Sequence, residues 1–113
     1  MAYSEPYDAL DEKTRDISRA ITSLREELEA IDWYNQRVAT SKDASLKEVM
    51  AHNRDEEIEH AAMTIEWLRR NMDKWDDELR DYLFTSGSFI AVEEGGASEA
   101  TDESSLSIGT MKS

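Results

Sequence analysis

A seven-residue repeat of apolar side chains dominates the first third of the chain and restricts the folds open to it. After Pro6 the sequence has no glycine or proline as far as Thr40, and five apolar residues recur at this spacing: Leu10, Ile17, Leu24, Ile31 and Val38. Ile21 and Leu28 widen the stripe, as an α-helix requires. The pattern predicts one long helix from about Tyr7 to Thr40, roughly 45 Å in length, which needs a partner to be stable.

The next segment of the chain is expected to supply that partner. The stretch "TSKDASLKE" interrupts the repeat, and Ser45 with Glu48 fits a capping box that would start a second helix, running to about Asn71. A connection of about five residues favours antiparallel neighbours, so the two helices are predicted to form a hairpin. The stretch "DKWDDELRDYLF" predicts a short third helix with Asp73 as its cap, and its apolar side would consist of Trp75, Leu79, Tyr82 and Leu83.

The second helix carries more apolar surface than one hairpin can cover. One stripe contains Leu46, Met50, Asn53, Glu57, His60, Ala61, Thr64 and Leu68, and a second contains Ile58, Ala62, Ile65 and Met72. Because a two-helix hairpin has a single contact face, the surplus predicts self-association, most simply as a two-fold dimer. The predicted fold is all-α, an antiparallel two-helix hairpin plus a short C-terminal helix, dimerising into a four-helix bundle.

Two chemically active residues interrupt the first of these stripes. Glu57 and His60 are three positions apart, so they share one face of the helix, where an uncompensated carboxylate would cost several kcal/mol. Glu27 lies at the edge of the apolar stripe of the first helix. A two-fold dimer would join both copies of all three residues into four carboxylates and two imidazoles, which suit two iron or manganese ions better than zinc. The alternative is an interhelical ion pair with an arginine such as Arg54.

Further residues near this set have two readings each. Tyr34, one heptad beyond Glu27, would place a phenol beside the metals, although such a tyrosine more often packs in a core. Glu26 and Glu29, with Trp33 a turn further on, face away from the seam and form either an outer cation site or an ordinary solvated acidic face. The remaining candidates are given structural roles: His52 is assigned to surface pairing, and Trp67 and Trp75 to packing at subunit contacts.

Composition excludes several classes of function. The 113 residues carry 26 acidic and 13 basic side chains, for a net charge of −13, which would repel nucleic-acid phosphates. No apolar run is long enough for a membrane span or a secretory signal, so a cytoplasmic location is expected. The absence of cysteine excludes disulfides and thiolate metal sites.

The composition changes beyond Phe84, where Gly, Ser, Thr and acidic residues predict a flexible linker around an isolated apolar patch of Phe89, Ile90 and Val92. The last nine residues, "SLSIGTMKS", carry Leu106, Ile108 and Met111 and read either as a docking peptide or as a frayed terminus. The predicted organisation is a helical domain over residues 1–92, an acidic linker over 93–103 and a docking peptide over 104–113.

Three stretches, "EELEAIDWYNQR", "AHNRDEEIEHAAMTIEWLRRN" and "YLF", resemble the encapsulated ferritins, two-helix members of the ferritin-like superfamily that are packaged inside encapsulin nanocompartments. The likeness covers about residues 10 to 92. It implies a ferritin-like bundle and a ferroxidase, which oxidises Fe²⁺ with O₂ or peroxide at a di-iron centre between two subunits. The implied ligands are Glu27, Glu57 and His60, with Tyr34 beside the site and Glu26, Glu29 and Trp33 along the path by which metal reaches it.

The resemblance also implies an assembly and a location. Encapsulated ferritins form open rings of dimers, commonly decamers, which enclose no mineral, so storage falls to the surrounding encapsulin shell. The stretch "SLSIGTMKS" resembles an encapsulin cargo-loading peptide, which places the protein inside the nanocompartment and residues 104–113 against the shell protein. Two other functions stay in competition: a non-catalytic iron-binding adaptor, and a structural helical oligomer loaded into an encapsulin.

Overall fold

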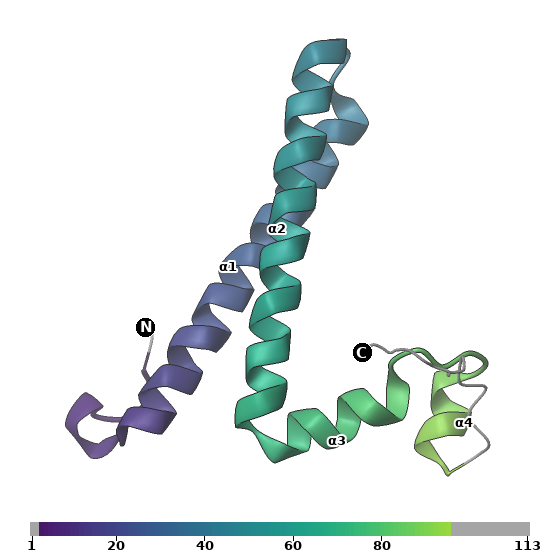
Figure 1. Ribbon diagram of the computed structural model, residues 1–113. Coiled ribbons are helices and arrows are strands. Elements are labelled where there is room, and N and C mark those ends of the chain that lie inside the picture. The colour runs from purple at the N-terminus through teal and green to yellow at the C-terminus, as the bar shows by residue number, and fades with distance from the viewer. Residues whose placement is uncertain (1–2, 96–113) are drawn as a thin grey trace. The chain divides into compact units, whose positions relative to one another are not determined.

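The computed structural model describes residues 3–95, and within this range every regular element is helical. The elements are the 3₁₀ helix η1 (Tyr7–Ala9) and four α-helices, α1 (Glu12–Thr40), α2 (Ala44–Asn71), α3 (Asp73–Tyr82) and α4 (Phe89–Glu93) (Figure 1). The chain divides into two compact units, Met1–Asn71 and Met72–Ser113. The prediction of an all-α protomer built on a helical hairpin is confirmed.

The first unit is an antiparallel hairpin, in which α1 and α2 lie side by side (Figure 1). α1 begins after Asp11, whose side chain accepts a hydrogen bond from the Thr14 backbone N–H at 2.8 Å. This cap satisfies one of the orphan N–H groups of the first turn, and it lowers the pKa of the Asp11 carboxyl. The predicted start near Tyr7 was wrong, because residues Tyr7–Ala9 form a separate 3₁₀ turn that ends at Leu10.

The turn between the two helices is set by Asp43. Its Oδ2 accepts hydrogen bonds from the Leu46 backbone N–H and the Ser45 hydroxyl, both at 2.9 Å, and these lower the pKa of the carboxyl. α2 therefore starts at Ala44, and Ser45 lies inside its first turn. The predicted capping box of Ser45 and Glu48 was wrong, and the connection has three residues instead of about five.

The hairpin buries little of its apolar surface. Among the described residues only Ala61 and Leu68, both on α2, are buried. The five heptad residues predicted for α1 are all half-buried; four of them, Ile17, Leu24, Ile31 and Val38, lie in the helix, and Leu10 lies just before it. Large side chains stay exposed on both helices, with Leu28 at 51% and Ile58 at 47%. The surplus apolar surface expected from the second stripe of α2 is therefore present in the protomer.

The second unit begins with α3, and its start differs from the prediction. Met72 occupies the N-cap position and offers no side-chain hydrogen bond, so Asp73 is the first residue of the helix instead of its cap. Asp73 and Asp76 lie in the first turn, where the partial positive charge of the helix N-terminus favours carboxylates.

The segment expected to be linker contains a helix. The chain passes through Phe84 and Gly87, which have φ angles of 62° and 88°, and Ser88 then caps α4 by accepting a hydrogen bond from the Ala91 N–H at 3.2 Å. The left-handed residues turn the chain and the serine starts a new helix. The apolar patch of Phe89, Ile90 and Val92 is thus one short helix, and α4 contacts α3.

In the described part of the chain, no helix is both long enough and apolar enough to cross a membrane. The predicted docking peptide, residues 104–113, lies outside the described residues, as does most of the predicted acidic linker.

Candidate metal centre

Glu57 and His60 form the α2 half of the predicted site. Their spacing places both on one face of the helix, with His60 Nδ1 3.5 Å from Glu57 Oε1. The side chains are 29% and 44% exposed, respectively, so neither is hidden and neither is fully solvated. Because a strong charge-assisted hydrogen bond would be near 2.8 Å, the two groups are neighbours that remain able to bind a third partner.

Glu27, on α1, lies against the same stretch of α2. Its Oε1 accepts a hydrogen bond from the Thr64 hydroxyl at 3.1 Å, and the same Thr64 Oγ1 lies 3.1 Å from the backbone carbonyl oxygen of His60. Thr64 is half-buried between the helices. The hairpin therefore brings Glu27 to the turn of α2 that follows Glu57 and His60. Thr64 had been placed in the stripe but given no role; its position four residues after His60 was the available signal.

One protomer does not complete a metal site. Among residues 3–95, no three His, Cys, Asp or Glu side chains lie close enough to hold an ion together. The donor set of hard carboxylate oxygens and one imidazole nevertheless suits iron or manganese. The described part of one chain therefore has the kinds of ligand that such an ion prefers, but it brings too few of them together to bind the ion alone.

Arg54, the arginine named in the alternative of an interhelical ion pair, has other partners. Arg54 Nε pairs with Asp55 Oδ1 at 3.0 Å, and its second nitrogen donates to Asn35 Oδ1 at 3.0 Å. Arg54 thus links α1 to α2 through an amide, and it leaves Glu27 and Glu57 without its charge.

The residues predicted to surround the site divide into half-buried and exposed ones, as the helix spacing predicts. Tyr34 is half-buried, and the Arg37 guanidinium lies 5.3 Å from the centre of its ring. Glu26 and Glu29 are exposed, as is Trp33 at 50%, which borders a shallow hollow of about 360 Å³ near the end of α1. The inner and outer placement is as expected, and the roles of these residues stay predictions. His52 is exposed.

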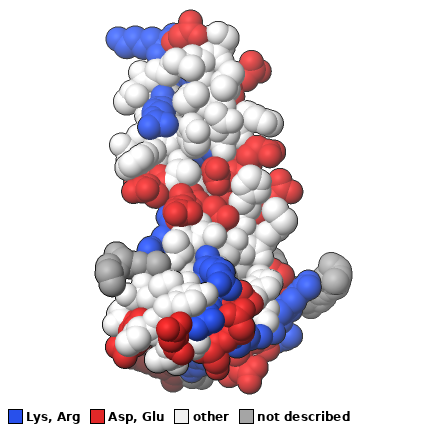
Figure 2. Space-filling model, turned by 90° about the vertical axis from the view of Figure 1, so that its left-hand side faces the viewer, with Lys and Arg blue, Asp and Glu red and all other residues white. Residues whose placement is uncertain are grey.

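Acidic side chains gather near the middle of the hairpin. On the face shown in Figure 2, Asp and Glu form a band about midway along the hairpin, and α1 carries Glu26, Glu27 and Glu29 near its midpoint. A concentration of negative charge attracts cations to this part of the surface before any of them is bound.

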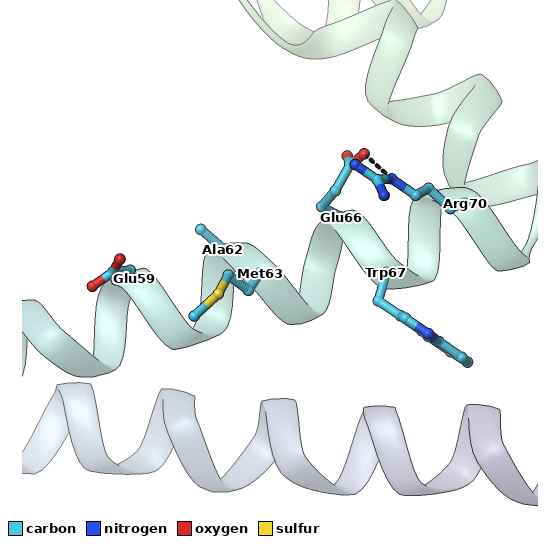
Figure 3. A pocket seen from close by; sticks show the side chains of 6 residues that line it. All are labelled: Glu59, Ala62, Met63, Glu66, Trp67 and Arg70. Atoms are coloured by element: carbon cyan, nitrogen blue, oxygen red, sulfur yellow. Dashed lines mark hydrogen bonds and ion pairs between the residues drawn. The ribbon is translucent and has the colours of Figure 1, made fainter.

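A second hollow, of about 440 Å³, lies on α2 and has a different character. Glu66 and Arg70 form an ion pair beside it, while Met63 and Trp67 supply apolar lining (Figure 3). Glu66 accepts from Arg69 at 2.7 Å and from Arg70 at 2.6 Å. The two guanidinium groups hold the pKa of Glu66 at about 2, so this carboxylate is committed to internal pairing and is no ligand.

The ion pairs of Glu66 predict a dependence of stability on acid. A pKa lowered from 4.5 to about 2 adds stability above pH 4.5, and that stability is lost as the pH falls through 2. Glu66→Gln should melt roughly 1 to 4 °C below wild type at neutral pH, since the pairs are partly exposed, and the gap should close between pH 4.5 and 2. Glu59→Gln, an exposed neighbour outside the pairs, is the control. A gap that stays constant down to pH 2 in thermal melts would contradict this assignment.

Fold and donor set together define a class of protein. An all-helical protomer built on a hairpin of two long helices, with carboxylates and an imidazole near their contact, is typical of ferritin-like proteins. Residues 2–86 match the model of the EncFtn-like family, and the chain belongs to that family.

Individual relatives agree with this membership. The chain is 54% identical over 101 residues to "Ferritin-like protein" of Thermotoga maritima, covering 88% of this chain and 89% of the relative. It is 51% identical over 120 residues to "Encapsulated ferritin-like protein" of Rhodospirillum rubrum, covering 96% and 86%. The crystal structure of a Nitrosomonas europaea protein superposes with a TM-score of 0.76 at 58% identity, covering 79% of this chain and 99% of that one.

Proposed function

We propose that the protein is a ferroxidase, which oxidises Fe²⁺ to Fe³⁺ at a di-iron centre shared by two protomers and so supplies iron for mineral storage in an encapsulin shell. The observation that carries the proposal is the placement of Glu27 at the turn of α2 that follows Glu57 and His60, with all three residues half-buried. Membership of the EncFtn-like family supports it.

The centre is shared because one chain supplies half of the donors. Bundle sites of this kind use four carboxylates and two imidazoles, and a two-fold axis doubles the two carboxylates and one imidazole of each protomer. The exposed apolar side chains of both helices, among them Leu28 and Ile58, supply surface for a second copy to cover. We infer a dimer, and a ring of dimers such as a decamer as the larger assembly.

The residues of the chain divide the chemistry between them. Fe²⁺ is the substrate, and two ions lose one electron each; together with two protons, the two electrons reduce either one O₂ to H₂O₂ or one H₂O₂ to two waters. Glu27 and Glu57 are hard anionic donors, which stabilise Fe³⁺ more than Fe²⁺ and favour the loss of an electron. His60 contributes a neutral nitrogen ligand, and Tyr34 places a phenol beside the centre.

The outer residues concentrate the substrate. Exposed Glu26 and Glu29, with Trp33 a turn away, lie on the acidic middle of α1, where they would attract Fe²⁺ and pass it inward. The proposed location is the interior of an encapsulin nanocompartment in the cytoplasm, reached through residues 104–113. The name of the Rhodospirillum rubrum relative, "Encapsulated ferritin-like protein", supports this part of the proposal.

Mixing the anaerobic wild-type protein and Fe²⁺ with oxygenated buffer tests the function. Ferric absorbance should rise well above the rate in buffer alone. Because the centre needs two chains, specific activity should fall when the protein is diluted enough for dimers to dissociate. Stoichiometric uptake of Fe²⁺ without oxidation would favour the adaptor instead. An assembly that binds no iron, and that neither iron nor chelator changes, would favour the structural oligomer.

A further inference from the structure

Thr64 contacts two predicted ligands that come from different helices, Glu27 on α1 and His60 on α2. Thr64 Oγ1 lies 3.1 Å from Glu27 Oε1 on α1 and 3.1 Å from the backbone carbonyl oxygen of His60 on α2. The interaction is internal to one chain, so it is present before a second protomer arrives. It acts between residues 37 positions apart in the sequence.

The hydroxyl has one hydrogen and two acceptors within reach. An ionised carboxylate is a stronger acceptor than a peptide carbonyl, so the proton is expected to point at Glu27 rather than at the His60 carbonyl. The half-buried setting protects the bond from competing water. Because the contact uses Oε1 of Glu27, it leaves Oε2 for a cation.

We propose that Thr64 is a positioning residue, whose hydroxyl fixes the Glu27 carboxylate beside His60 and thereby sets the affinity of the half-site for a divalent metal. The inference rests on the proposed function, in which Glu27 is a ligand. A glutamate on an otherwise free stem loses conformational entropy when it binds an ion, and a hydrogen bond that selects its conformation beforehand reduces that loss.

The test uses Mn²⁺ as an ion that stays divalent in air. Free Mn²⁺ is measured by its electron paramagnetic resonance signal during titration of the full-length, metal-free protein. Thr64→Val keeps the shape of the side chain and removes the hydroxyl, so Mn²⁺ should bind about 10- to 100-fold more weakly. Thr64→Ser should bind within about threefold of wild type, because it restores the donor.

A matched control comes from α1. Thr40 Oγ1 donates to the Gln36 carbonyl at 3.1 Å, a distance equal to that between Thr64 Oγ1 and the His60 carbonyl oxygen, but within the described residues Thr40 has no hydrogen bond to a carboxylate. Thr40→Val should leave Mn²⁺ affinity unchanged. If Thr64→Val fails to fold, Thr64→Ser against Thr64→Ala gives the same comparison, since that pair differs by the hydroxyl alone.

The outcomes separate this inference from the proposed function. Wild-type affinity in Thr64→Val, or equal weakness of Thr64→Ser and Thr64→Ala, would overturn the role of the hydroxyl while wild-type oxidation of Fe²⁺ stood. Failure of the wild-type protein to bind Mn²⁺ or Fe²⁺ at all would overturn both. Loss of affinity in the variants that lack the hydroxyl, with melting temperatures of the metal-free proteins unchanged, is the expected result.

Discussion

Replacing Glu57 with alanine is expected to lower the initial rate of Fe²⁺ oxidation by at least about 100-fold. Loss of a residue that supports a metal ligand from outside costs about 10- to 100-fold, and Glu57 is proposed as a ligand itself. Two-fold symmetry increases the effect, because one substitution removes a carboxylate from both halves of the centre. His60→Ala should behave in the same way, since it removes the one nitrogen donor of each chain.

Neighbouring acids on α2 make this experiment specific. Glu56 and Glu59 are exposed and flank Glu57, so Glu56→Ala and Glu59→Ala change the charge equally and should oxidise Fe²⁺ at the wild-type rate. The metal-free Glu57→Ala protein should melt at or above the wild-type temperature, because it relieves repulsion between carboxylates in the dimer seam. Wild-type rates in both Glu57→Ala and His60→Ala, measured by ferric absorbance, would refute the assigned ligands.

Deleting residues 104–113 is expected to abolish co-purification with a co-expressed encapsulin shell protein and to leave Fe²⁺ oxidation intact. These residues lie outside the part of the chain that the structure describes, and the prediction rests on their sequence. Leu106, Ile108 and Met111 are spaced along a nearly uncharged segment, as in a peptide that places apolar side chains in pockets of a partner.

Substitutions in the full-length chain show whether loading depends on the apolar side chains of the tail or only on its length. Replacing Leu106, Ile108 and Met111 together with serine should abolish loading as completely as deletion, whereas replacing Ser104, Ser105 and Thr110 with alanine should preserve it. Shell and cargo are measured in the same purified fraction. Loading of the truncated chain at the wild-type level would show that docking lies elsewhere and would leave the chemistry of the site untouched.

The long-range pattern of the sequence predicted the hairpin well, and local chemistry decided where its helices begin. The heptad residues of α1 are half-buried because their period matches the helix, whatever residue starts it. The predicted helix starts were wrong because Asp11 and Asp43 accept hydrogen bonds from the first free backbone N–H groups. The spacing of the apolar residues does not show which of several neighbouring residues will cap a helix. α4 was missed because five residues give no measurable period.

Glu27, Glu57 and His60 were predicted to be ligands from their place in apolar stripes, and this role stays a prediction. The structure shows Glu57 beside His60 and Glu27 in contact with Thr64, one turn after His60. The contact of Thr64 with Glu27 was not predictable, because it depends on the lateral alignment of the two helices. Arg54 illustrates the same limit. The sequence alone allowed it to pair with the candidate ligands, whereas in the fold it contacts Asn35 and Asp55.

The small interior of the hairpin has a consequence for the life of the chain in a cell. With only Ala61 and Leu68 hidden among its described residues, a newly synthesised copy has little to hold it closed, and open helices are substrates for proteases. If the proposed dimer forms, a copy that meets another soon after synthesis is expected to be protected, and a solitary copy is expected to be degraded. The amount of functional protein should therefore rise steeply once expression passes a threshold, instead of in proportion to messenger RNA.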